Sequence, residues 1–157
     1  MSVPFVIRTA SPAEEPAVAA VLREAFTPYA RALGREITPE AFTRLGGAIA
    51  RGDVCVAVEG DAILGLMTLK HEDGWLEVDQ LAVAQAQQKR GIGRALLADA
   101  EAIARREGIA TLRLHTAAMF GHLLRLYTGA GFREMHRGPP PHGADTYERV
   151  FFVKTLR

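Results

Sequence analysis

Between Leu81 and Leu97 the chain reads LAVAQAQQKRGIGRALL. The first three residues have the composition of a buried strand end, and a polar run with two glycines follows them. A helix is predicted to begin at Gly91 and to stop at Gly108, because apolar side chains recur on one face between these two glycines. The stretch therefore predicts a strand, a basic loop and a helix in direct succession.

The loop from Gln88 to Gly93 has the features of a phosphate site. Helix N-termini carry unpaired backbone N–H groups and the positive end of the helix dipole, and Gly91 and Gly93 allow the backbone to approach an anion closely. Further donors surround the same point: Gln88, Lys89, Arg90 and Arg94. Because each charge-assisted hydrogen bond is worth roughly 1.5–3 kcal/mol, several of them can hold a diphosphate. We therefore interpret Gln88–Gly93 as a pyrophosphate-binding loop.

Three other interpretations compete with this one. A dinucleotide-binding fingerprint requires glycine or alanine where Leu96 stands, and it requires an acidic ribose contact that this chain lacks. A Walker A loop requires Gly-Lys-Ser/Thr, which is absent. A tight turn before a glycine-started helix is the purely structural alternative. A nucleotide-binding protein is therefore the more distant functional alternative.

The remaining sequence predicts one α+β domain that spans residues 1–157. A helix is expected to begin near Glu15 and to end near Pro28, and a second, weaker helix to begin at residues 38–40. Residues 54–83 contain strand formers separated by glycine-containing turns, which predicts an antiparallel meander. The predicted strands are Phe5–Arg8, Val54–Val58, Ala62–Leu69, Trp75–Val83, Thr111–Thr116, Phe132–His136 and Tyr147–Thr155, and a further helix is predicted at Gly121–Ala130. We thus expect a mixed, mostly antiparallel sheet of six to seven strands flanked by about four helices.

The composition is that of an ordinary soluble protein. The 157 residues include 19 basic and 18 acidic ones, so a net charge of +1 argues against a nucleic-acid or anionic-membrane partner. Cys55 is the single cysteine, which excludes an internal disulfide, and its valine neighbours indicate a core thiol in a reducing compartment. The N-terminus lacks an apolar signal core, and no apolar run approaches the ~20 residues that span a bilayer. We therefore expect a cytoplasmic protein.

A second motif, LYTGAGF at Leu126–Phe132, follows the phosphate loop along the chain. Together the two motifs resemble the GNAT superfamily of N-acetyltransferases. The first is similar to the family's Gln/Arg-x-x-Gly-x-Gly/Ala loop, and the second to its late tyrosine followed by Gly-Phe. The matching positions are Gln88, Gly91, Gly93, Tyr127, Gly131 and Phe132. Because the order of the elements agrees over nearly the whole chain, the resemblance implies the GNAT fold.

The resemblance implies that acetyl-CoA is the co-substrate and that the acetyl group passes directly to a primary amine in a ternary complex. It implies that the backbone of Leu81, Ala82 and Val83 pairs with the pantetheine arm, and that the Val83 N–H stabilises the oxyanion. It implies that the diphosphate is held by Gln88, Lys89, Arg90, Gly91, Ile92, Gly93 and Arg94. The strands that end at Val83 and begin at Thr111 are expected to splay apart. Met119 stands near a position where many relatives have asparagine, so that side-chain contact to the cofactor is left open.

Glu77 and Asp79 are the candidate bases. They alternate along the strand that ends at Val83, so both project to the face of Leu81 and Val83. An alkylammonium has a pKa of ~10.4, and acyl transfer to it therefore needs a base. Glu77 also matches the position of the base in relatives that use a strand glutamate. A solvated strand face without a chemical role is the alternative, and His115 is a further candidate base.

Tyr127 is the candidate acid. A phenol of pKa ~10 can protonate the departing thiolate, whose conjugate acid resembles a cysteine thiol of pKa ~8.5. The Gly131-Phe132 context in the resemblance favours this role. The alternative is an amphipathic tyrosine that packs its ring on the sheet.

The sequence leaves the acceptor open, because small polyamines, amino acids, antibiotics, protein N-termini and lysines all serve as acceptors within one such fold. The histidines show no metal-ligand spacing, so no metal is expected. A catalytically idle acyl-CoA-binding module, acting as a sensor or docking domain, is the alternative to an enzyme. Relatives often dimerise, which makes a homodimer a further expectation.

Overall fold

The computed structural model describes residues 4–38 and 41–156. The fold divides into two compact units. The first comprises Met1–Leu69 and Gln80–Leu96, and the second comprises Lys70–Asp79 and Leu97–Arg157. The chain passes between them within three elements, which are β3 (Ala62–Glu72), β4 (Trp75–Val83) and α3 (Ile92–Arg106).

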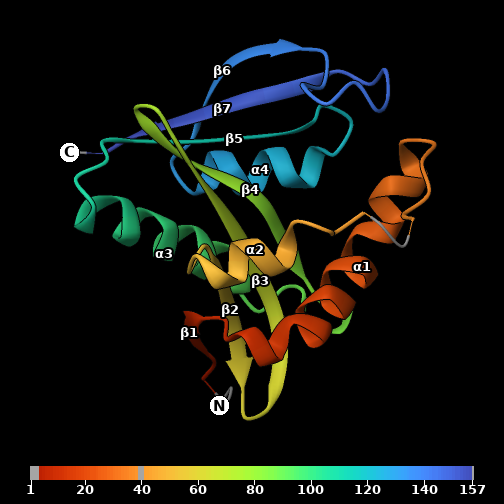
Figure 1. The fold of residues 1–157 in the computed structure, drawn as a ribbon. Coiled ribbons are helices and arrows are strands. Elements are labelled where there is room, and N and C mark those ends of the chain that lie inside the picture. Colours follow the sequence, from red (N-terminus) through yellow and green to blue (C-terminus); the bar gives the residue numbers. More distant parts are fainter. Residues whose placement is uncertain (1–3, 39–40, 157) are drawn as a thin grey trace. The chain divides into compact units, whose positions relative to one another are not determined.

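The first unit packs two helices on antiparallel strands (Figure 1). β1 (Val6–Thr9), β2 (Val54–Glu59) and the first part of β3 pair in that order. α1 (Glu15–Ala32) and α2 (Leu45–Ala50) each bury one apolar stripe against them. The shared core consists mainly of aliphatic side chains: Val18, Leu22, Leu45, Ile49, Val54, Val56 and Leu66.

The first helix begins where the sequence predicts, at Glu15, after the short 3-10 turn η1 (Pro12–Glu14). The prediction that it ends near Pro28 is wrong, because Pro28 lies inside the helix, which continues to Ala32. A proline removes only its own N–H bond from the helix ladder. The actual stop is Gly34, whose φ of 72° turns the chain out of the helix.

The second helix is shorter than the sequence indicates. Pro39 and Glu40, where it is predicted to begin, lie outside the described residues, and α2 begins at Leu45. Gly46 and Gly47 occupy its first turns and weaken its intrinsic helix propensity by roughly 1 kcal/mol each. Its stability therefore comes from the burial of its apolar face.

The second unit is built around β5 (Thr111–Ala117). β5 pairs in parallel with the first part of β4, and it pairs antiparallel with β7 (Arg149–Thr155) along its whole length. β7 pairs antiparallel with β6 (Arg133–Gly138), which is the edge strand (Figure 1). α4 (Gly121–Gly129) precedes β6 in the chain.

A β-bulge interrupts β6 at Met135. The register pairs Glu134 with Phe152 and His136 with Phe151, so Met135 is an extra residue on the edge strand. A bulge bends its strand and re-aims the neighbouring side chains. The side chains of Met135 and His136 can therefore lie on the same face of the sheet although the two residues are adjacent in sequence.

A buried ion pair holds the connection between β6 and β7. Arg149 donates to both carboxylate oxygens of Asp145, at 3.0 and 2.8 Å, and to the Tyr147 carbonyl at 2.9 Å. The two charged side chains are only 5% and 4% exposed. The proline segment of this connection contains a turn that the Gly143 N–H closes on the Pro140 carbonyl at 3.1 Å.

In the described ranges the strand order is β1-β2-β3-β4-β5-β7-β6, with β4–β5 as the parallel pair. Seven strands and four α-helices confirm the predicted α+β class with a mixed, mostly antiparallel sheet. The strand Trp75–Val83 has the predicted bounds, and Cys55 is a buried core thiol as predicted. That residues 1–157 form a single domain stays a prediction. None of the described helices combines the length and apolar character needed to cross a membrane.

Candidate functional site

The predicted phosphate loop lies in the first unit, between β4 and α3, and it is open to solvent. Lys89 and Gly91 both adopt left-handed backbone conformations, with φ of 71° and 81°. The Ala95 N–H bonds the Gly91 carbonyl at 3.0 Å, so three N–H groups precede the first helical bond, those of Ile92, Gly93 and Arg94. Nothing lies within 4 Å of the point where a Cβ on Gly91 would stand. This open start of α3 fits a diphosphate.

Arg90 makes its contacts on the protein side of the loop. Its guanidinium donates to the Glu59 carboxylate at 2.9 Å and to the Gln87 side chain at 2.8 Å. These bonds tie the loop to β2 and place a carboxylate against the Arg90 charge. Lys89 and Arg94, which are exposed, supply positive charge on the solvent side.

Gly65 on β3 allows the start of α3 to pack closely. A Cβ at this position would lie 2.8 Å from the Ala82 carbonyl oxygen and 3.1 Å from a methyl group of Ile92. Ile92 is 2% exposed, so it anchors the first turn of α3 in the core. An isolated glycine within a strand, such as Gly65, is a sequence signal for the close approach of another backbone.

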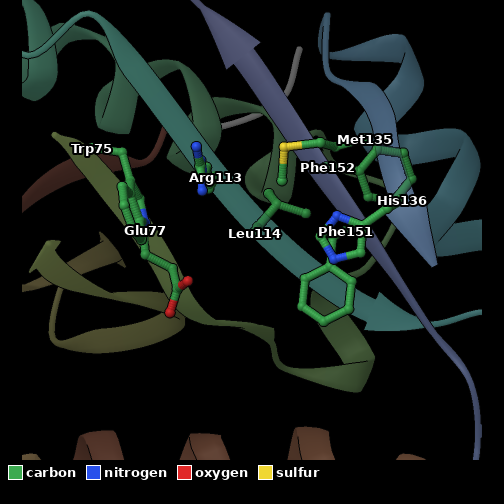
Figure 2. A pocket seen from close by; sticks show the side chains of 8 residues that line it. All are labelled: Trp75, Glu77, Arg113, Leu114, Met135, His136, Phe151 and Phe152. Atoms are coloured by element: carbon green, nitrogen blue, oxygen red, sulfur yellow. The ribbon is translucent and has the colours of Figure 1, made fainter. Parts of the chain in front are cut away.

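In the second unit, a cavity of about 220 Å³ lies over β5. Figure 2 shows Trp75 and Glu77 of β4 on one side of it and Met135, His136 and Phe151 on the other. The remaining lining residues are Arg113, Leu114 and Phe152. The bulge in β6 brings Met135 and His136 to the same wall.

Glu77 is half-buried in the wall of this cavity. Burial raises the pKa of its carboxyl above the ordinary value, and the negative charge of Asp79 raises it further. The positive charges of Lys70 and Arg113 oppose these effects only in part. Asp79 itself is exposed and lies 4.0 Å from the Lys70 ammonium. Glu77 is therefore the predicted carboxylate that lines the cavity, and its basicity is enhanced.

Arg113 is the neighbour of Glu77 on β5, because the two residues are Cα partners in the parallel register. Its guanidinium lies over the Trp75 ring, 4.2 Å from the ring centre. The Arg113 Nε and the Trp75 Nε1 are both buried without a hydrogen-bond partner. The cavity thus contains a cation whose donors are incompletely used.

His115 stands two residues beyond Arg113 on the same face of β5. Burial lowers the pKa of its imidazole, and the charge of Arg149 lowers it further. Its Nδ1 is buried and has no partner, and its ring lies 5.2 Å from the Phe151 ring. A neutral imidazole at this position can accept a proton, so His115 stays a candidate base. Within the described ranges, no group of three or more His, Cys, Asp or Glu side chains could hold a metal ion.

Tyr127 lies on α4 and is 7% exposed. Its ring contacts those of Phe132 and Phe152 at 6.3 and 5.7 Å between centres. These contacts pack α4 onto the sheet of the second unit. The ring therefore has a packing role, and the proposed acid role of the hydroxyl depends on the family motif.

A family model described as the acetyltransferase (GNAT) family matches residues 19–132. This chain belongs to the GNAT acetyltransferase family. The match contains both motifs, from the phosphate loop to Phe132. The resemblance seen in the sequence is thereby confirmed.

Individual relatives of this GNAT chain agree with the assignment. It is 34% identical over 84 residues to the uncharacterized N-acetyltransferase YvbK of Bacillus subtilis (strain 168), a match that covers 53% of this chain and 54% of that protein. Among solved structures, the PaiA N-acetyltransferase of Thermoplasma acidophilum in complex with coenzyme A has a TM-score of 0.83 and 22% identity, covering 98% of this chain and all of that one. Ard1 of Thermoplasma volcanium has a TM-score of 0.79 and 19% identity, with 99% of each chain covered. These two likenesses show the fold.

The site residues predicted for this GNAT chain fall in both units. Leu81, Ala82, Val83 and the loop Gln88–Arg94 belong to the first, whereas Glu77, Asp79 and Tyr127 belong to the second. Of the eight residues that line the cavity, only Glu77 is predicted from the sequence, and the polar or aromatic ones among the rest include Trp75, Arg113, His136 and Phe151. Strand alternation alone predicts the faces of two of them, because Trp75 precedes Glu77 by two residues on one strand and Arg113 precedes His115 by two residues on the other.

Proposed function

We propose that this GNAT chain moves the acetyl group of acetyl-CoA to a primary amine of a small molecule or peptide, with both substrates bound together. The observation that carries the proposal is the open start of α3, where the N–H groups of Ile92, Gly93 and Arg94 precede the first helical bond. In this proposal these groups and Lys89 bind the diphosphate of the cofactor. The coenzyme A in the PaiA N-acetyltransferase structure supports the choice of ligand.

The end of β4 is proposed to bind the pantetheine arm. The register of β4 with β5 comprises Leu76 with Leu112 and Glu77 with Arg113 in the described residues. The backbone of Leu81, Ala82 and Val83 lies beyond that register, and strand N–H and C=O groups are suited to an extended amide-bearing chain. The Gln88 side chain donates to the Val83 carbonyl at 3.4 Å. This arrangement supports the proposal that the Val83 N–H stabilises the oxyanion.

Glu77 is proposed to take the proton that the amine loses. The nitrogen forms a bond to the acetyl carbon as the carbon–sulfur bond breaks, so the products are an acetamide and a thiol. The raised pKa of Glu77 supports this role, because a base whose pKa lies closer to neutrality accepts a proton more readily. Asp79 adds negative charge that attracts a cationic amine, and Tyr127 is proposed to protonate the departing sulfur.

Calorimetric titration with coenzyme A tests the loop assignment. We expect Gly93→Glu to weaken binding roughly fivefold or more, because a like charge at ~4 Å from a phosphate costs about 1 kcal/mol in water and about 4 kcal/mol near a protein surface. Ala98→Glu is the matched control, since it places the same charge at an exposed position further along α3. Equal affinity of the two variants would remove the loop from the site.

Release of free thiol from acetyl-CoA with a panel of amines tests the reaction. We expect release with at least one class of primary amine. Tight coenzyme A binding without release for any amine would favour the idle binding module instead.

A further inference from the structure

The cavity of the second unit contains two opposite charges that do not form an ion pair with each other. Glu77 and Arg113 are partners in the register of β4 with β5, so their side chains leave the same face of the sheet. Within residues 4–38 and 41–156, neither one makes an ion pair or a side-chain hydrogen bond. The Arg113 guanidinium stacks instead on the Trp75 ring, 4.2 Å from its centre.

The Arg113 side chain is suited to a carboxylate. A guanidinium presents its N–H groups in a planar fork that matches the two oxygens of a carboxylate. Its Nε is buried without a partner among the described residues, so a carboxylate in the cavity would bind at the terminal nitrogens of the fork.

The rest of the cavity limits what can bind beside these charges. A volume of about 220 Å³ is below the ~300–1,000 Å³ that is typical of sites for drug-sized ligands. Met135, Leu114 and Phe151 give the lining an apolar character, and the His136 ring stacks on that of Phe151 at 4.4 Å. An amino acid with an apolar side chain matches the size and polarity of this lining.

The charges also argue against a polyamine. Glu77 can receive one ammonium group, but a second ammonium inside the same small cavity would approach the permanently charged Arg113. Like charges in a partly buried site repel, and no carboxylate among the described residues forms an ion pair with Arg113. A protein N-terminus is disfavoured too, because its first residue carries an amide in place of a carboxylate.

We infer that the acceptor is a free α-amino acid with an apolar side chain, whose amino group faces Glu77 and whose carboxylate binds Arg113. The inference rests on the proposed acetyl transfer and names its second substrate. It makes Arg113 a specificity-determining residue, because an amine without a carboxylate leaves the guanidinium without its ligand.

Three matched sets of acceptors test this inference: L-phenylalanine, L-leucine and L-methionine, their methyl esters, and their decarboxylated amines. Thiol release from acetyl-CoA is expected to have a kcat/KM roughly 10- to 150-fold higher for the acids than for either uncharged set. Arg113→Met should raise the KM for the acids by a similar factor with little change in kcat, and it should abolish the preference for acid over ester. Arg125→Met, which removes an exposed arginine of α4, is the control that should leave both unchanged.

Calorimetric binding of L-phenylalanine to the protein without acetyl-CoA is the second readout. Binding that Arg113→Met removes, at an unchanged melting temperature, supports the inference. Thiol release with amines that shows no preference for acids, or a preference that survives Arg113→Met, would overturn it and leave the proposed function standing. Amino-acid binding without any thiol release would overturn the proposed reaction and keep the acceptor site. Absence of both would overturn the inference.

Discussion

Gly65→Ala tests whether close packing of β3 positions the start of α3. The new Cβ would lie 2.8 Å from the Ala82 carbonyl oxygen, well inside the 3.4 Å at which ordinary contact begins, and 3.1 Å from Ile92. The backbone carbonyl cannot rotate away as a side chain can, so the strand end and the helix start must shift. Such overpacking costs about 1–3 kcal/mol. For a chain of this size we expect the melting temperature to fall by roughly 2–12 °C, at about 2–4 °C per kcal/mol.

Thermal unfolding measures the cost of this substitution, and calorimetric titration with coenzyme A measures its effect on the site. Affinity should fall as well, because the displaced residues adjoin the proposed cofactor loop. Gly138→Ala on β6 is the matched control, since its Cβ would meet nothing within 4 Å and its φ is not positive. That change should leave the protein as stable as before or about 0.4–1 kcal/mol more stable. If Gly65→Ala melts and binds like Gly138→Ala, the close-packing argument is wrong.

Three further predictions concern the second unit. Tyr127→Phe should lower kcat by up to roughly 10²–10⁴-fold with little change in coenzyme A affinity, and single-turnover rates equal to those of the parent would exclude the hydroxyl from the chemistry. Glu77→Gln should abolish the base yet raise the melting temperature at pH 7. The raised pKa of Glu77 means that the folded state binds the proton more tightly than the unfolded state does. The stability of the folded protein therefore falls as pH rises from the ordinary pKa of 4.5 through the higher folded pKa, and the glutamine variant avoids this loss. Melting curves below pH 4 should coincide, and an equal difference at both pH values would contradict the assignment. Asp145→Ala leaves Arg149 buried without its carboxylate and should cost about 3–5 kcal/mol in denaturant unfolding. The double variant Asp145→Ala/Arg149→Met should regain most of the lost stability. An Asp145→Ala variant as stable as the parent would refute a structural role for the ion pair.

Local sequence signals predicted most of the fold. Alternating apolar residues and glycine turns are short-range features, which is why β4 has the bounds Trp75–Val83 in both the prediction and the structure. Pro28 predicts too early an end for α1 because proline is the more conspicuous helix breaker, whereas the residue that stops the helix is Gly34, with its positive φ. A glycine after a helix is an equally local signal.

The cavity could not be predicted in the same way. Its composition depends on which residues of different strands stand opposite each other, as Glu77 and Arg113 do. It also depends on the bulge at Met135, which no local pattern announces and which brings His136 to the cavity wall. Register and bulges follow from long-range packing, so the sequence indicated a base on β4 without indicating what faces it.

The place of Met135 and His136 on an edge strand has an evolutionary consequence. Within the described part of the chain β6 pairs with β7 alone, so residues can be exchanged, added or removed along β6 while the rest of the sheet keeps its hydrogen bonds. The opposite wall belongs to β4, an interior strand that also bears Glu77 and tolerates far less change. Substitutions in this one edge strand could thus change the acceptor specificity of a related enzyme while the reactive carboxylate on β4 keeps its position.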